Sequence, residues 1–268
     1  TVIEKKIDTI ITFGIYYRKT KSIIDSFENK KINNIDNFDD IKNLNIKDPS
    51  KVLFFIENPS NPFLKIIPLK AIREQFKNSF IILDFSLAGL LNHMDIHLAD
   101  IALTSCTKYI SGHNDLLAGL LISNNLDLEN DLWNYRGMVG SLVDPFSSYL
   151  LLRSLRTYDM RINKMLQNTK FILESFKKNK LIEKLFYPGQ GINKNQIPIF
   201  EKSLHHGGSV ITFLCNKNLN LTRNIENLRS IKMAPTFGSI DSIIEIPLYM
   251  SSGQQYDPNK NYDNLLEN

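Results

Sequence analysis

Lys108 lies in a short polar segment, SCTKYISGHND (105–115), between two apolar runs. These runs are IALT before the segment (101–104) and LLAGLLI after it (116–122). Lysine side chains usually keep their ammonium group in water, so a lysine between two strand-like runs needs a chemical explanation. A buried lysine amine has a lowered pKa, and such an amine can attack an aldehyde and form a Schiff base with it.

Polar residues also follow the two preceding apolar runs. VLFFIE (52–57) leads into a turn that contains Asn61, and FIIL (80–83) leads into Asp84. Taken singly, an asparagine before proline, an aspartate cap or a hydroxyl near a turn has a local structural explanation. Functional groups of open α/β sheets, however, collect where the strands end. The consecutive strand ends therefore predict one shared site that contains Asn61, Asp84, Ser105, Thr107 and Lys108.

The apolar runs and their spacing predict an α/β fold. Continuous apolar runs suit strands that are covered on both faces, as in parallel sheets. A helix with Leu69, Ile72 and Phe76 on one face is expected at 68–78. Strand, helix and strand at this spacing indicate βαβ units. We expect strands at 7–13, 52–57, 80–85, 100–105 and 116–123, and a helix with a surface loop over the polar segment 21–46.

The sequence pattern changes near Pro145. A long amphipathic helical region is expected over 145–179, followed by a strand at 208–216 and a helix at 220–230. This order predicts a second, smaller α+β domain. We therefore divide the chain into a large domain at 1–154 and a C-terminal domain at 155–268.

The composition argues against several functional classes. The net charge of +4 is mild and the charges are interspersed, so no nucleic-acid partner is expected. No apolar run reaches the roughly 18–20 residues of a membrane span. Cys106 and Cys215 are far apart, which favours free thiols and a cytoplasmic location. His93 and His97 have the spacing of a helical metal pair, but no third ligand accompanies them, and we expect no metal site.

Four sequence blocks resemble those of the Cys/Met-metabolism family of pyridoxal-phosphate-dependent enzymes, the trans-sulfuration enzymes. Among its members, the blocks are most similar to those of cystathionine gamma-synthases. The resemblance implies a fold-type I (aspartate-aminotransferase-like) large domain that binds pyridoxal 5'-phosphate (PLP) on a mainly parallel sheet, plus a smaller α+β C-terminal domain. The blocks are ENPSNPFLKI (57–66), LDFSLAGLL (83–91) with SCTKYISGHNDLLAG (105–119), VDPFSSYLLLRSLRTYDMRI (143–162) and APTFGSIDSIIEIP (234–247).

The resemblance also implies roles for individual residues. Lys108 would bind the aldehyde of PLP and carry protons during the reaction. Asp84 would pair with the pyridine nitrogen and keep it protonated, which lets the ring act as an electron sink. Ser105 and Thr107 would hold the phosphate group. Tyr17, in the segment IDTIITFGIYYRKT (7–20), would stack on the ring and take part in catalysis.

Three further positions are expected at the site on the same basis. Asn61 would approach the phenolic oxygen of PLP and the substrate. Ser86 stands where the family has threonine, and we include it among the cofactor-binding residues. Thr236 stands where the family has a serine near the substrate. The chain departs from the family after Tyr17, where Arg18 and Lys19 replace two glycines.

The reaction implied by the resemblance is a replacement at Cγ of an amino acid. L-Cysteine would displace the leaving group of an activated homoserine ester and give cystathionine. The alternatives are a cystathionine gamma- or beta-lyase, an O-acylhomoserine sulfhydrylase, or a catalytically inactive fragment. Self-association as a dimer or tetramer is implied, because family active sites borrow residues across a dimer. The chain also resembles an internal piece of a longer protein, truncated at both ends.

Overall fold

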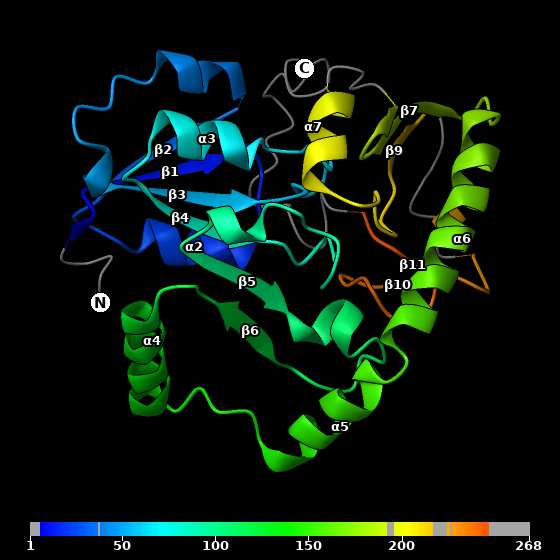
Figure 1. Ribbon diagram of the computed structural model, residues 1–268. Helices are drawn as coiled ribbons and strands as arrows, with labels where there is room; N and C mark the ends of the chain where they lie inside the picture. The colour runs from blue at the N-terminus through cyan, green and yellow to red at the C-terminus, as the bar shows by residue number, and fades with distance from the viewer. Residues whose placement is uncertain (1–5, 37, 192–195, 217–223, 226, 247–268) are drawn as a thin grey trace.

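A six-stranded sheet dominates the first half of the structure, a computed structural model that describes residues 6–36, 38–191, 196–216, 224–225 and 227–246 (Figure 1). The strand order is β2-β1-β3-β4-β5-β6, and every neighbouring pair is parallel except β5 and β6. The predicted α/β class with a mainly parallel sheet is confirmed. The strands are β1 (Thr9–Phe13), β2 (Lys31–Ile35), β3 (Val52–Glu57), β4 (Phe80–Asp84), β5 (Ile101–Ser105) and β6 (Gly119–Ile122).

Helices cover both faces of this sheet, which explains the unbroken apolar run of β3. All six β3 residues are buried. Successive strand side chains point to opposite faces. Phe54 therefore packs with residues of α3 (Leu69–Gln75), whereas Phe55 packs with Ile24 of α2 (Arg18–Asp25). Each fully buried side chain of this kind contributes about 1.5–3 kcal/mol of transfer free energy.

Strand β2 is a feature that the sequence prediction missed. The expected helix and loop over 21–46 is wrong for Lys31–Ile35, which pairs in parallel with β1. This strand has the sequence KINNI, and of its five residues Ile35 alone is buried. An edge strand with mostly polar, solvent-facing side chains carries no clear periodic signal. Three short 3₁₀ turns lie at Phe38–Asn43, Pro49–Lys51 and Ile96–Leu98.

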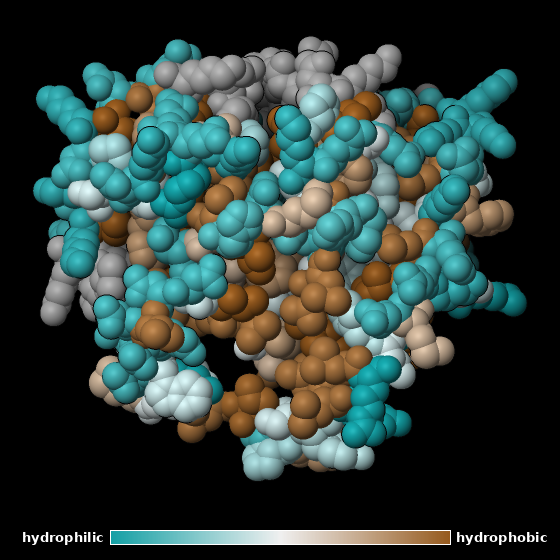
Figure 2. Space-filling view, viewed as in Figure 1, coloured by the Kyte–Doolittle hydropathy of each residue, from teal (hydrophilic) through white to brown (hydrophobic). Residues whose placement is uncertain are grey.

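Three helices connect the sheet to the rest of the molecule. They are α4 (Leu126–Val139), α5 (Pro145–Leu155) and α6 (Tyr158–Lys177), so the predicted helical region at 145–179 is two helices rather than one. The side chains of Asn125 and Asp144 each accept two backbone N–H groups and cap α4 and α5. Figure 2 shows apolar side chains gathered around a hollow beside these two helices. No helix among the described residues is long and apolar enough to cross a membrane.

Smaller sheets lie beyond α6. A three-stranded antiparallel sheet has the order β8-β7-β9, and a two-stranded parallel sheet joins β10 and β11. Residues 220–223 and 226 of the predicted helix at 220–230 lie outside the described residues, and the domain boundary at 154/155 stays a prediction. The elements are β7 (Ile182–Tyr187), β8 (Gln190–Gly191), α7 (Ile197–Ser203), β9 (Thr212–Cys215), β10 (Lys232–Met233) and β11 (Ile243–Ile244).

Asn58, Asn92 and His93 form a buried polar cluster, here called the clasp. Asn92 Nδ2 donates to the carbonyl of His206 at 2.7 Å, and its Oδ1 accepts the N–H of His206 at 2.8 Å. His93 forms an antiparallel bridge with Leu204. The Nδ2 atom of Asn58 lies 3.1 Å from Nε2 of His93. The clasp thus ties the loops that follow β3 and β4 to the segment that follows α7.

Candidate active site

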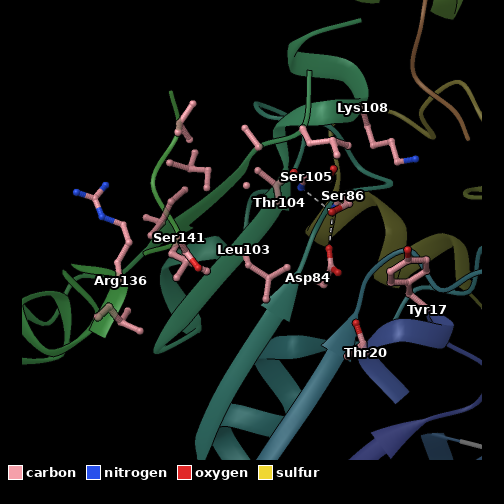
Figure 3. Close-up of a pocket in the computed structure, with 18 of the residues that line it drawn as sticks. Tyr17, Thr20, Asp84, Ser86, Leu103, Thr104, Ser105, Lys108, Arg136 and Ser141 are labelled. Atoms are coloured by element: carbon pink, nitrogen blue, oxygen red, sulfur yellow. Dashed lines mark hydrogen bonds between the residues drawn. The ribbon is translucent and has the colours of Figure 1, made fainter. Parts of the chain in front are cut away.

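The carboxyl ends of β3, β4 and β5 face a cavity of about 1190 Å³. Its polar part brings together most of the predicted site residues, as Figure 3 shows for the labelled ones. Its remaining wall is largely apolar and runs between β6 and α4. Thr107 and Thr236 are not among the lining residues. The predicted residues that line the cavity are Tyr17, Asn61, Asp84, Ser86, Ser105 and Lys108.

Asp84 forms the acidic floor of the site. Its Oδ1 accepts the backbone N–H of Ser86 at 2.9 Å, and Ser86 Oγ accepts the backbone N–H of Ser105 at 2.9 Å (Figure 3). These bonds link the ends of β4 and β5. Burial raises the pKa of Asp84, although the two hydrogen bonds from Ser86 oppose that shift. A cationic partner in the cavity would therefore bind this carboxylate strongly.

Lys108 lies at a kink in the helical turn Cys106–Ile110, which follows β5 directly, and its own backbone (φ −85°, ψ −119°) is not helical. Arg161 of α6 holds this turn: its guanidinium donates to the carbonyls of Tyr109 at 2.8 Å and Ile110 at 3.0 Å. The same guanidinium donates to the carbonyl of Ser154 at the end of α5, at 3.0 Å. The backbone of the lysine turn is thus fixed from outside the sheet.

The amine of Lys108 reaches the segment between β10 and β11. Its Nζ donates to Thr236 Oγ1 at 2.9 Å and lies 4.9 Å from the centroid of the Phe237 ring. Burial lowers the pKa of Lys108, and the nearby charge of Glu245 acts in the opposite direction. Gly238 has φ +80°, and a Cβ there would lie 2.8 Å from the amide nitrogen of Tyr109. The segment therefore packs backbone to backbone against the lysine turn.

Two predicted residues differ in how they face the cavity. Tyr17 lines it and is 50% exposed, so its ring is free to cover a ligand. Thr107 is directed elsewhere: its hydroxyl accepts the backbone N–H of Ala118 at 3.1 Å. Of the two hydroxyls predicted to bind phosphate, Ser105 and Thr107, Ser105 is therefore the one that lines the cavity.

Glu57 is a site residue that the sequence reasoning missed. It lines the cavity, is 7% exposed and accepts the backbone N–H of Tyr17 through Oε2 at 2.9 Å. Burial and the neighbouring Asp84 charge raise the pKa of Glu57 to about 8. An acidic residue at the end of an apolar run, beside another strand that ends in an acid, was the signal available in the sequence.

The donor set fits PLP chemically. The cavity contains a lysine amine for an aldehyde, a buried carboxylate for a protonated pyridine nitrogen and hydroxyls for a phosphate. Among the described residues, no group of three or more His, Cys, Asp or Glu side chains is arranged to hold a metal ion.

The model of the Cys/Met metabolism PLP-dependent enzyme family matches residues 1–267. The chain belongs to this family. It is 31% identical to a cystathionine beta-lyase of Lactococcus lactis subsp. cremoris, over 81% of this chain and 57% of that protein. It is 28% identical to the chloroplastic cystathionine gamma-synthase 1 of Arabidopsis thaliana, over 90% of this chain and 44% of that protein. The matched region is thus about half the length of these family relatives.

Solved structures of the family share the fold. The cystathionine gamma-lyase of Lactobacillus plantarum, complexed with L-serine, superposes with a TM-score of 0.84 at 25% identity, covering 94% of this chain and 68% of that one. The cystathionine gamma-synthase of Xanthomonas oryzae pv. oryzae gives 0.84 at 23% identity, covering 94% and 67%. The fold-type I architecture expected from the sequence is confirmed.

Proposed function

We propose that this chain is part of a PLP-dependent trans-sulfuration enzyme of the cystathionine gamma-synthase type. The reaction is replacement of the γ leaving group of an activated homoserine ester by L-cysteine, which gives cystathionine. The observation that carries the proposal is the Lys108 amine, which has a lowered pKa and lines the same cavity as the buried Asp84 carboxylate. The 90% coverage of this chain by the match to the Arabidopsis gamma-synthase supports the choice within the family.

Each residue has a stated task in the proposal. Lys108 would hold the aldehyde of PLP, Asp84 would hold its ring nitrogen and Tyr17 would cover its ring. Ser105 would serve the phosphate end because it lines the cavity, whereas Ser86 would support Asp84 at the ring end. When bound, PLP supplies an electron sink for negative charge at the substrate Cα.

Proton transfer is the task of Lys108. With the substrate amine bound in its place, Lys108 Nζ would be free to take the Cα proton and then to assist removal of a Cβ proton. The burial that lowers the pKa of Lys108 favours the free-base form of the amine, which suits it to this work. Thr236 accepts from Nζ at 2.9 Å and orients the amine. The leaving group departs from Cγ, the cysteine sulfur bonds to Cγ, and protons return to Cβ and Cα.

A second candidate keeps PLP but cleaves cystathionine instead of forming it. Lactococcus lactis relatives named cystathionine beta-lyase are 30–31% identical, and a cystathionine gamma-lyase of Dictyostelium discoideum is 30% identical. Both reactions begin with removal of the Cα proton, so the same Lys108 serves either one. The two differ in the products formed.

The test has two stages. A visible absorption band that appears with added PLP in wild type and not in Lys108→Ala establishes the cofactor. Product analysis then follows, with a homoserine ester plus cysteine in one assay and cystathionine alone in another. Cystathionine formed in the first assay supports the gamma-synthase, whereas release of homocysteine or cysteine in the second supports a lyase. Absence of the band from both proteins would favour an inactive fragment.

Self-association belongs to the same proposal. Helix α4 buries none of its residues, and its Trp133 and Met138 are 63% and 78% exposed. Apolar side chains exposed in a group commonly mark a protein interface. We propose a homodimer or tetramer in the cytoplasm, tested by light scattering of the purified protein, where a monomeric mass would contradict it.

A further inference from the structure

Glu57 and Asp84 are partners in the register of two parallel strands. β3 and β4 pair residue by residue up to Glu57 and Asp84, where both strands end. Register partners point to the same face of a sheet, so the two carboxyl groups are neighbours on the cavity side. Both are nine-tenths or more buried, at 7% and 8% exposure. Two carboxylates placed this closely in a buried site do not ionise together easily.

The two oxygens of Glu57 have different surroundings. Oε2 accepts the backbone N–H of Tyr17 at 2.9 Å. Because Tyr17 directly precedes α2, this bond fixes the start of that helix. Oε1 is buried and has no hydrogen-bond partner among the residues that the structure describes, although the backbone N–H of Asn61 lies near enough to the carboxyl group to lower its pKa. A buried oxygen without a partner costs free energy unless a ligand or a proton satisfies it. The unpartnered oxygen belongs to a residue that lines the cavity.

We propose that Glu57 is a positioning residue of the cofactor site that works as a neutral acid. One oxygen fixes the backbone of Tyr17, and the proton on the other keeps the charge of the Glu57–Asp84 pair at minus one. A single negative charge matches a single protonated ring nitrogen. The inference rests on the proposed function, because the ligand that benefits is PLP.

The groups around Glu57 are consistent with this protonation. Asp84 of β4 adds a like charge, and Tyr16, beside the start of α2, is close enough for the Glu57 charge to raise its pKa. Lys21 and Asp25 of α2 also face Tyr16 with opposite charges. Lys108 lines the same cavity from the turn after β5. Loss of the Glu57 proton would therefore add a second negative charge beside Asp84.

The experiment compares PLP affinity at pH 7 and pH 9.5, by titration of the visible band, in wild type and two variants. The change in PLP affinity over this interval is expected to differ about tenfold between wild type and Glu57→Gln, because the glutamine stays neutral, although it can still accept from Tyr17. Glu57→Ala, which cannot anchor Tyr17, is expected to bind about tenfold more weakly already at pH 7. The exposed Glu28→Gln is the matched control and should follow wild type. Equal pH ratios in wild type and Glu57→Gln would overturn the proposal.

A second readout does not depend on the cofactor. The pKa of Glu57 is higher in the folded chain than in the unfolded one, so the folded state gives up its proton later as pH rises. Its contribution to stability is complete below about pH 4.5 and is lost as pH approaches 8. Wild type without PLP should therefore lose more thermal stability between pH 5 and 8 than Glu57→Gln. If no PLP band forms at all, the proposed function fails, and this comparison alone decides the protonation of Glu57: equal losses overturn it.

Discussion

Glu57 and Asn58 are consecutive in the chain, yet they belong to two polar clusters of opposite character. Asn58 joins the clasp, where its side chain donates to the carbonyl of Ile67, accepts the N–H of Ile67 and meets His93. Glu57 joins the cavity floor, where one of its oxygens has no partner among the described residues. Both clusters are buried. If Glu57 serves the cofactor as proposed, burial alone does not mark a functional site, whereas a buried polar group left for a ligand does.

The comparison makes separable predictions, because the cavity cluster should govern chemistry and the clasp should govern stability. The largest effect is expected for Lys108→Ala. Turnover should fall by at least about 10⁴-fold if the amine is both the anchor of the aldehyde and the proton carrier, as proposed. The unfolding temperature without PLP should be unchanged or slightly higher, because a half-buried amine is removed. Steady-state kinetics measure turnover, and calorimetry measures the unfolding temperature. A large loss of stability would show that Lys108 has a structural role instead.

Asp84→Asn is expected to have the next largest effect. The amide keeps the shape and can accept from Ser86, but it cannot pair with a protonated ring nitrogen. Turnover should fall by about 10²–10³-fold, the usual cost of losing one fixed electrostatic partner at a reacting centre. Stability without PLP should rise slightly, because the pKa of Asp84 is raised by burial and its charge is costly there. Unchanged turnover would contradict the pairing.

For the clasp, a substitution of His93 is expected to change stability rather than turnover. Burial lowers its pKa to about 4, so the unfolded chain takes up a proton before the folded chain does as pH falls. The contribution is present above pH 6.5 and is lost as pH falls toward 4, by about 3 kcal/mol in total. His93→Gln should flatten this acid slope in denaturant unfolding, whereas the exposed His97→Gln should not. An unaltered slope in His93→Gln would show that the clasp does not titrate.

The smallest effect is expected for Thr236→Ala. The substitution removes the acceptor of the Lys108 hydrogen bond, which is worth about 1 kcal/mol in a partly exposed site. Turnover should fall roughly fivefold, and Thr236→Ser should restore it because the hydroxyl remains. If serine and alanine behaved alike, the hydroxyl would have no part in orienting the amine.

Much of the fold followed from the sequence, because buried strands carry a strong signal. VLFFIE coincides with β3, and the polar ends of β3, β4 and β5 meet at one cavity as expected. The apolar pattern of the sequence did not reveal elements that are poorly buried. Strand β2 is mostly polar, and α4 has no buried face that would create a pattern. Glu57 was missed for a different reason. It ends an apolar run and gains meaning only from its register with Asp84, a contact between separate strands.

The position of Arg161 has a consequence for the order of folding. The backbone of the lysine turn is held by a guanidinium 52 residues further along the chain, and the same group also holds the end of α5. Contacts between residues far apart in sequence form late, because a long loop must close first. We expect the six strands to pair before α6 docks, and the turn that carries Lys108 to acquire its final shape only when α6 docks. Assembly of the sheet and maturation of the lysine turn would then be distinct events, separated by the docking of one helix.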